Sequence, residues 1–239
     1  MKNEKNISTI ISKYGVLMVF ILMFIVFSFT APNFLNVRNL LNVSRQINTL
    51  GICSVGMTLL LIAGSIDLSQ GYQLSLLNVL CAWMMAEKGV PMVLAILLTL
   101  VVGALIGVIN GVIVVRSGVH PMIVTLGVSQ ALNGISFLFS NGIPIYGFPD
   151  SFSKLGQGTI GAVPISLIIM VIIMIIGHFI LSRLPYGRYL YAVGSNEESA
   201  KLAGVNTGTV KIIAHTLSAF LTAIAAVLLL SRTNSGLSS

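Results

Sequence analysis

Residues 89–115 read GVPMVLAILLTLVVGALIGVINGVIVV, a run of 27 residues without a charged side chain. A helix needs about 20 mostly apolar residues to cross the roughly 30 Å hydrocarbon layer of a bilayer. This run is long enough to cross a membrane as one helix. It therefore decides the class of the protein, which we expect to lie within a lipid bilayer.

The rest of the chain repeats this pattern. Six further uncharged runs cover residues 14–37, 46–66, 68–86, 117–149, 155–182 and 212–231. Of the 239 residues, 56% are hydrophobic and 8% are charged, and the mean hydropathy is +0.99. Soluble domains carry about 25% charged residues. The composition thus excludes a disordered chain and leaves too few polar side chains to cover a soluble domain.

The apolar runs mix Leu, Ile, Val and Met without the alternation of a membrane β-strand, and a lone segment in lipid must satisfy its own backbone hydrogen bonds. We therefore predict an all-α, polytopic membrane protein, with residues 1–239 forming a single transmembrane domain. About seven transmembrane helices are expected, over residues 14–31, 50–66, 71–86, 91–115, 120–140, 161–181 and 212–231. The polar segment 36–49 fits either an amphipathic helix in the membrane interface or a polar helix buried in the bundle.

The basic residues predict the orientation. The formal net charge is +7, which in a membrane protein reflects lysines and arginines kept on the cytoplasmic side rather than binding of nucleic acid. With a cytoplasmic N-terminus, strict alternation of the spans puts eight basic residues inside and five outside. The polar stretch 182–210 is then cytoplasmic, and residues 141–160 are external.

No enzyme motif is present. The three histidines do not form H-E-x-x-H, and no glycine is followed by lysine, so the phosphate-binding sequence G-x-x-x-x-G-K-[ST] is absent. We therefore expect no catalytic residue, no metal site and no bound cofactor, with any ATP hydrolysed by another subunit. Cys53 and Cys81 lie in apolar runs, where a cysteine behaves as a small hydrophobe.

Asp67 stands between two apolar runs, in Gly64-Ser65-Ile66-Asp67-Leu68-Ser69. A carboxylate inside a membrane is costly and often functional, so Asp67 and Ser69 are candidates for the translocation path. The alternative is structural, because either side chain could cap the next helix at a break in the chain.

Three glycines, Gly103, Gly107 and Gly111, are spaced four residues apart. They fall on one stripe of a helix and would let another helix backbone approach closely. We interpret them as a helix-packing surface, with Asn110 available to form a hydrogen bond across it.

The stretch 194–205, GSNEESAKLAGV, predicts a short capped helix. Asn196 can cap its N-terminus, Glu197 and Glu198 suit the positive end of the helix dipole, and Gly204 can end it. These features fit a helix that projects from the membrane toward a partner, and they fit an ordinary loop helix equally well.

Several motifs in order resemble the permease subunits of bacterial ABC importers for simple sugars. They are Gly56-Met57-Thr58, Ile66-Asp67-Leu68-Ser69, Asn110-Gly111, His120-Pro121-Met122-Ile123-Val124-Thr125-Leu126-Gly127, Asn141-Gly142-Ile143-Pro144-Ile145 and Tyr191-Ala192-Val193-Gly194-Ser195-Asn196-Glu197-Glu198-Ser199-Ala200. The resemblance covers the chain from about residue 33. It implies transport by alternating access across the bacterial plasma membrane, driven by ATP on a partner subunit.

In the wider class a loop with the pattern E-A-A-x-x-x-G docks on the ATPase. The resemblance implies this coupling role for Gly194, Asn196, Glu197, Glu198, Ala200 and Gly204, with Ser199 in place of the first alanine. It also implies an ABC ATPase subunit, a second permease subunit and an extracytoplasmic sugar-binding protein as partners.

One departure concerns length. Members of the resembled family continue for several helices after the span 212–231, so we expect this chain to lack C-terminal helices. The alternative function is a secondary transporter or channel that is not coupled to ATP. The sugar is not specified: Gln73, Asn78, Trp83, Gln130 and Asn133 suit sugar binding and helix packing equally.

Overall fold

The structure is a computed structural model that describes residues 2–237. It contains ten helices in the described part and one short hairpin. The first helices are α1 (Lys2–Thr30), α2 (Val37–Ile62), α3 (Gln70–Ala86), α4 (Met92–Ser117), α5 (Pro121–Ser140) and α6 (Asp150–Gln157). After β1 (Thr159–Ile160) and β2 (Val163–Pro164) come α7 (Ile165–Arg183), α8 (Pro185–Ser195), α9 (Glu197–Leu202) and α10 (Thr207–Thr233).

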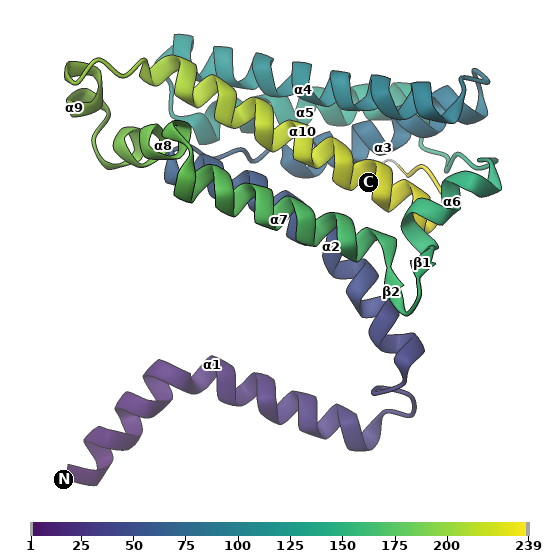
Figure 1. The fold of residues 1–239 in the computed structure, drawn as a ribbon, viewed down its shortest axis with the longest axis horizontal. Helices are drawn as coiled ribbons and strands as arrows, with labels where there is room; N and C mark the ends of the chain where they lie inside the picture. Colours follow the sequence, from purple (N-terminus) through teal and green to yellow (C-terminus); the bar gives the residue numbers. More distant parts are fainter. Residues whose placement is uncertain (1, 238–239) are drawn as a thin grey trace. The chain divides into compact units, whose positions relative to one another are not determined.

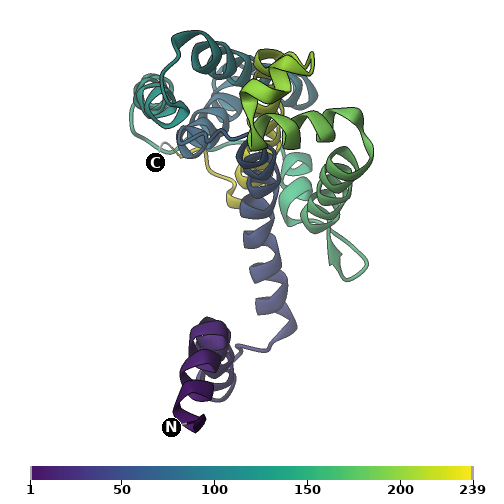
Figure 2. The same cartoon turned by 90° about the vertical axis from the view of Figure 1, so that its left-hand side faces the viewer.

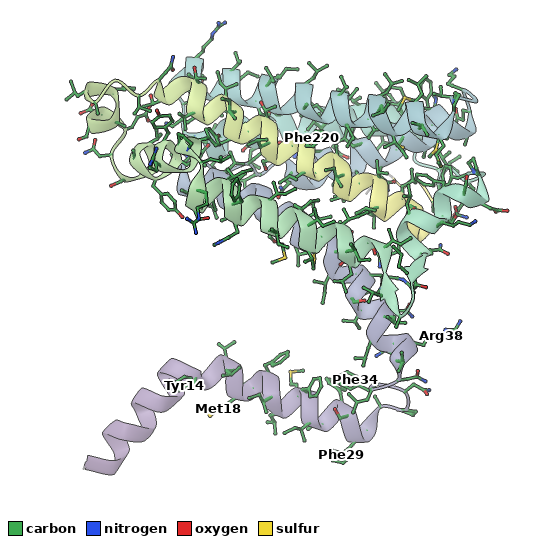
Figure 3. The ribbon with its side chains drawn as sticks, in the orientation of Figure 1. Tyr14, Met18, Phe29, Phe34, Arg38 and Phe220 are labelled. Carbon is green, nitrogen blue, oxygen red and sulfur yellow. The ribbon has the colours of Figure 1, made fainter. Side chains whose placement is uncertain are left out.

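The chain divides into two compact units, the first ending at Val43 and the second beginning at Ser44. The first unit contains α1, whose apolar side chains are exposed along the helix, as for Val16 and Phe29 at 88% each. The turn after α1 folds Phe34 back onto the helix, where its ring meets that of Phe24 edge to face at 5.4 Å (Figure 3).

The second unit is organised around α10. This helix packs most extensively against α4 and also contacts α3, α6 and α8 (Figure 1). Small side chains make the close packing possible, since Ala214, Ala219, Ala223 and Ala226 of α10 are fully buried. We attribute the central place of α10 to this alanine-rich face, which lets neighbouring helices approach closely.

Five helices in the described part are long and apolar enough to cross a membrane, namely α2, α4, α5, α7 and α10. The all-α membrane class is therefore confirmed, whereas the predicted number of about seven spans is not. The apolar part of α1 covers Tyr14–Thr30, and α3 has 17 residues, so both fall short of the length of the other five.

Several predicted boundaries were wrong. The segment 36–49 is not a separate helix, because α2 runs without interruption from Val37 to Ile62. The segment that we predicted to be external, residues 141–160, contains α6 and the first strand of an antiparallel hairpin that pairs Thr159 with Pro164, so the chain is not purely helical. Gly161 turns this hairpin with a φ of +61°, which is accessible to glycine at little cost.

Helix α6 packs against the end of α10 that lies far from α9 (Figure 1). The Ser231 hydroxyl donates to the Phe152 carbonyl at 2.6 Å and accepts from the Gly156 amide at 2.7 Å. Phe152 itself is fully buried in the apolar core beside Leu230. Helix α6 is thus attached to the C-terminal end of α10.

Candidate functional site

A break in the membrane bundle separates α2 from α3. Helix α2 ends at Ile62, Gly64 adopts a left-handed φ of +69°, and α3 begins only at Gln70. The segment Gly64 to Ser69, where the sequence allowed a break, thus lies entirely outside a helix. Non-helical backbone within a membrane protein is stable where other protein groups surround it, and the neighbouring side chains supply such groups here.

Asp67 is the centre of a buried polar cluster. Its side chain is 1% exposed. One carboxylate oxygen, Oδ1, accepts from the Ser69 amide at 2.9 Å and from the Ser69 hydroxyl at 2.5 Å. The other, Oδ2, accepts from Gln73 Nε2 at 2.8 Å and from Asn110 Nδ2 at 3.2 Å. Four donors therefore surround this carboxylate, which is the arrangement that stabilises its ionised form.

The same cluster joins three helices. Gln73 comes from α3 and Asn110 from α4, and both amides also donate to Ser69 Oγ, at 2.7 and 2.9 Å. The Leu68 amide, in the break itself, donates to Thr125 Oγ1 of α5 at 3.1 Å. The break is thereby attached to α3, α4 and α5, and Asn110 reaches Asp67 rather than α10.

His215 completes the cluster from α10. Its ring is fully buried; Nε2 lies 2.9 Å from Ser65 Oγ, and Nδ1 lies 3.9 Å from Asp67 Oδ2. We did not predict His215 from the sequence, although an ionisable residue within an apolar run is a signal of function.

The glycine stripe of α4 faces α10. A Cβ added at Gly107 would lie 2.6 Å from the His215 carbonyl oxygen, and one at Gly111 would lie 2.7 Å from Cα of Ile212. At Gly103 the nearest atom would be Cβ of Ala223, at 2.6 Å. Each distance is too short for a real Cβ, so these positions let the two backbones approach as closely as they do.

The polar stretch 182–210 contains two helices, although the sequence predicted only one. Helix α8 is fixed to the bundle by Leu190 and Val193, which are buried, and by the Tyr186 hydroxyl, which donates to the Val210 carbonyl at 3.0 Å. Gly194 lies against the end of α2, where an added Cβ would overlap the Ile62 carbonyl oxygen. The loss of water around its hydroxyl raises the pKa of Tyr186.

Helix α9 is short and capped at both ends. Asn196 Oδ1 accepts from the Ser199 amide at 2.8 Å. At the other end Gly204 has a φ of +84°, and the Val205 amide donates to the Ala200 carbonyl at 3.0 Å, as in a Schellman motif. Ala200 is buried against the core beside α8.

The two acidic residues of α9 have different surroundings. Glu197 forms ion pairs with Lys201 at 3.1 Å and with Lys211 of α10, and it accepts from the Thr207 hydroxyl at 3.1 Å. The hydrogen bond from Lys211 lowers the pKa of Glu197 to about 2. Glu198 is exposed. The sequence could not distinguish the two, because they are adjacent and chemically alike.

The outer face of α9 carries an exposed apolar side chain. Leu202, in the last turn, is 91% exposed. Figure 2 shows α8 and α9 at the end of the second unit that also holds the first turns of α10. A groove of about 750 Å³ lies there, lined by the end of α4, the start of α5, α9 and the start of α10. The arrangement offers a projecting, partly apolar helix beside a groove.

The polar residues that suited sugar binding do not gather in one place. Gln73 belongs to the Asp67 cluster, Asn78 accepts from the Leu237 amide at 3.1 Å, and the Trp83 ring meets Phe139 at 4.9 Å. Gln130 is exposed and Asn133 half-buried on α5. Gln73, Asn78 and Trp83 thus take part in packing contacts.

Comparison with known proteins shows the family. The model of the branched-chain amino acid transport system / permease component family matches residues 39–239. The ribose import permease protein of Haemophilus influenzae is 35% identical, over 98% of this chain and 75% of its own length. The ribose import permease proteins of Bacillus subtilis and Escherichia coli K12 are 34% and 33% identical, over 95% and 92% of this chain and 70% and 69% of their own lengths.

No solved structure matches the chain. An L-arabinose ABC transporter permease protein of Azospirillum brasilense is 29% identical over 95% of it. The matched residues include the break at Asp67, the glycine stripe and both α8 and α9. The chain therefore belongs to the family of branched-chain amino acid transport system permease components, and within it to the ribose-permease-like sugar permeases of ABC importers.

Proposed function

We propose that this chain is the membrane subunit of an ATP-driven importer and that α9 is the helix through which a separate ATPase subunit moves it. The single observation that carries this proposal is the asymmetry of α9. Its inner side is anchored by Glu197 and Ala200, whereas Glu198 and Leu202 are exposed. An apolar side chain exposed at 91% suits burial in a partner's groove.

The anchoring supports the transmission of force. The ion pair between Glu197 and Lys211 joins α9 to α10, and α10 is the helix that packs against most of the bundle. A displacement of α9 would thus reach α10 directly and α4 through the glycine stripe. Alternating access by this route needs no nucleotide on this chain, so ATP is proposed to be bound and hydrolysed by the partner.

The substrate is proposed from the relatives. Their names refer to ribose and L-arabinose, and the name of a further relative, from Yersinia enterocolitica, refers to import of autoinducer 2. A monosaccharide or sugar-like solute is the class that we propose for this chain, delivered by an extracytoplasmic binding protein and moved by two permease subunits together. No observation favours a transporter driven by ions instead.

The proposed orientation has α8 and α9 in the cytoplasm and the N-terminus on the same side of the bacterial inner membrane. With α1 and α3 added to α2, α4, α5, α7 and α10, the proposal comprises seven spans. This assignment puts α6 and the β1–β2 hairpin on the outer surface.

Co-purification tests the docking role. The chain is produced with the ATPase subunit of its transport system, and the amount of ATPase retained in detergent is measured. We expect Glu198→Ala combined with Leu202→Glu to reduce retention at least fivefold, and Gly204→Val to do so by distorting the end of α9. Glu87→Ala, an exposed acid after α3, is the matched control. Full retention by both α9 variants would overturn the proposal.

A further inference from the structure

The contact between His215 and Asp67 is incomplete. His215 Nδ1 lies 3.9 Å from Asp67 Oδ2, beyond the range of about 2.7–3.2 Å for an N–H···O hydrogen bond. Among residues 2–237, this nitrogen has no hydrogen-bond partner, although the ring is fully buried. A buried polar atom without a partner is rare in folded proteins and unfavourable. A shift of less than about 1 Å would bring the two atoms within bonding range.

Asp67 and His215 are held by different partners. Asp67 is fixed to α3 and α4 by Gln73 and Asn110. His215 belongs to α10, and in the described part the only hydrogen bond of its ring goes to Ser65, which lies in the break itself, two residues before Asp67. The 3.9 Å gap therefore depends on the position of α10 relative to Asp67 and to the α3 and α4 side chains that hold Asp67.

The surface of α4 opposite His215 is smooth. Gly107 lies against the His215 carbonyl, and a Cβ at Gly111 would lie 3.3 Å from Cβ of His215. Neither residue has a side chain that would interlock with α10. At this level of the bundle α4 and α10 therefore meet through backbone atoms rather than through interlocking side chains.

The α9 anchor is one helical turn away. Lys211 precedes His215 by four residues on α10, and residues four apart share one face of a helix. Because Lys211 is paired with Glu197, a pull on α9 acts on α10 next to His215. The polar cluster and α9 are thus connected through a single rigid turn.

We propose that His215 and Asp67 are positioning residues of the transport cycle. The two side chains are separated in this conformation, and an Nδ1–H···Oδ2 hydrogen bond joins them in the conformation that follows ATP binding. Ser65 already joins the break to α10, and closing the gap would also join α10 to Asp67 and through it to Gln73 of α3 and Asn110 of α4. The inference rests on the proposed function, since it assumes that an ATPase subunit moves α9.

The test uses the complete transporter in lipid nanodiscs and needs no knowledge of the sugar. Leu68→Cys, in the break and 39% exposed, is introduced with Cys53→Ser and Cys81→Ala. Its rate of reaction with a maleimide is measured without nucleotide and after trapping with ATP and orthovanadate. We expect the two rates to differ at least fivefold.

Either His215→Gln or Asp67→Asn is expected to reduce this difference to less than twofold, and the double variant to resemble the single ones. His178→Gln, on the exposed face of α7, is the matched control and retains the full difference. Binding of the ATPase subunit, vanadate trapping and the thermal midpoint stay close to the parent, which a purely structural role would not allow.

Equal rates in the two states of the parent, or a full difference in His215→Gln, would overturn this inference. Failure of the parent to bind the ATPase subunit would instead overturn the proposed function. If His215→Gln does not fold, Ser65→Ala removes only the anchor of the ring. That variant should reduce the difference at least twofold, and an unchanged difference contradicts the proposal.

Discussion

Glu197 of α9 and Lys211 of α10 form an ion pair that attaches the short projecting helix α9 to α10, the most buried of the five candidate membrane spans in the described part. The Lys211 side chain is 17% exposed and that of Glu197 is 36% exposed. Thr207 and Lys201 also contact the Glu197 carboxylate. Helix α9 thus has one side attached to α10, which would transmit its motion to the bundle, and another side that is available to a partner.

Removing the ion pair should loosen α9 without unfolding the protein. A partly exposed pair contributes up to about 1 kcal/mol. We expect Lys211→Met to increase the hydrogen-exchange rates of the α9 amides by about two- to fivefold. Lys154→Met, an exposed lysine on α6, should leave them unchanged. Equal exchange rates in Lys211→Met and the parent would show that the pair does not hold α9.

Acid should weaken the same attachment over a defined range. The pKa of Glu197 is lowered from 4.5 to about 2, chiefly by Lys211. A lowered carboxyl pKa means that the stabilisation is complete well above pH 4.5 and is lost as the pH falls from there toward about 2. Exchange protection of α9, corrected for the intrinsic rate, should be constant from about pH 7 to 6 and then decline below about pH 4.5. Lys211→Met should show a smaller decline; the same decline in both proteins would assign it to another group.

A side chain on the glycine stripe should force α4 and α10 apart. Overpacking of a close contact costs about 1–3 kcal/mol, and Gly107 faces backbone atoms that cannot move aside. We expect Gly107→Leu to lower the thermal midpoint in nanodiscs by several degrees. Gly134→Leu is the control, because an added Cβ there meets no described atom within 4 Å. Equal midpoints for the two variants would contradict close packing at Gly107.

Gly194 should tolerate no side chain at all. An added Cβ would overlap the Ile62 carbonyl oxygen, where α8 meets the end of α2. We expect Gly194→Ala to displace α8 and to lower ATP-driven uptake at least tenfold, with the chain still inserted in the membrane. Gly127→Ala, at an open position on α5, provides the comparison. Normal uptake by Gly194→Ala would show that this junction is dispensable.

The sequence predicted the features that depend on one residue and its spacing. Long uncharged runs predicted the membrane helices, and the four-residue interval predicted that Gly103, Gly107 and Gly111 share one stripe. The break near Asp67 could be anticipated from Gly64 and a carboxylate between apolar runs. These signals are local, so they can be recognised before the chain is folded.

The features that sequence reasoning missed depend on contacts between distant segments. His215 approaches Asp67 across 148 positions of the chain, and Lys211 selects Glu197 over the adjacent Glu198 only because α9 folds back toward α10. Helix α8 was missed because Pro185 and Gly187 suggest a turn, whereas Leu190 and Val193 gain stability by burial in the core. No local propensity encodes such pairings.

The accessibility of Ser199 tests the central claim most directly. Ser199→Cys, on the exposed side of α9, is introduced with Cys53→Ser and Cys81→Ala, and a membrane-impermeant maleimide is applied to intact cells and to inside-out vesicles. We expect labelling only in the vesicles, slowed at least fivefold when purified ATPase subunit is added. Labelling in intact cells, or labelling in vesicles that the ATPase subunit does not slow, would contradict the account.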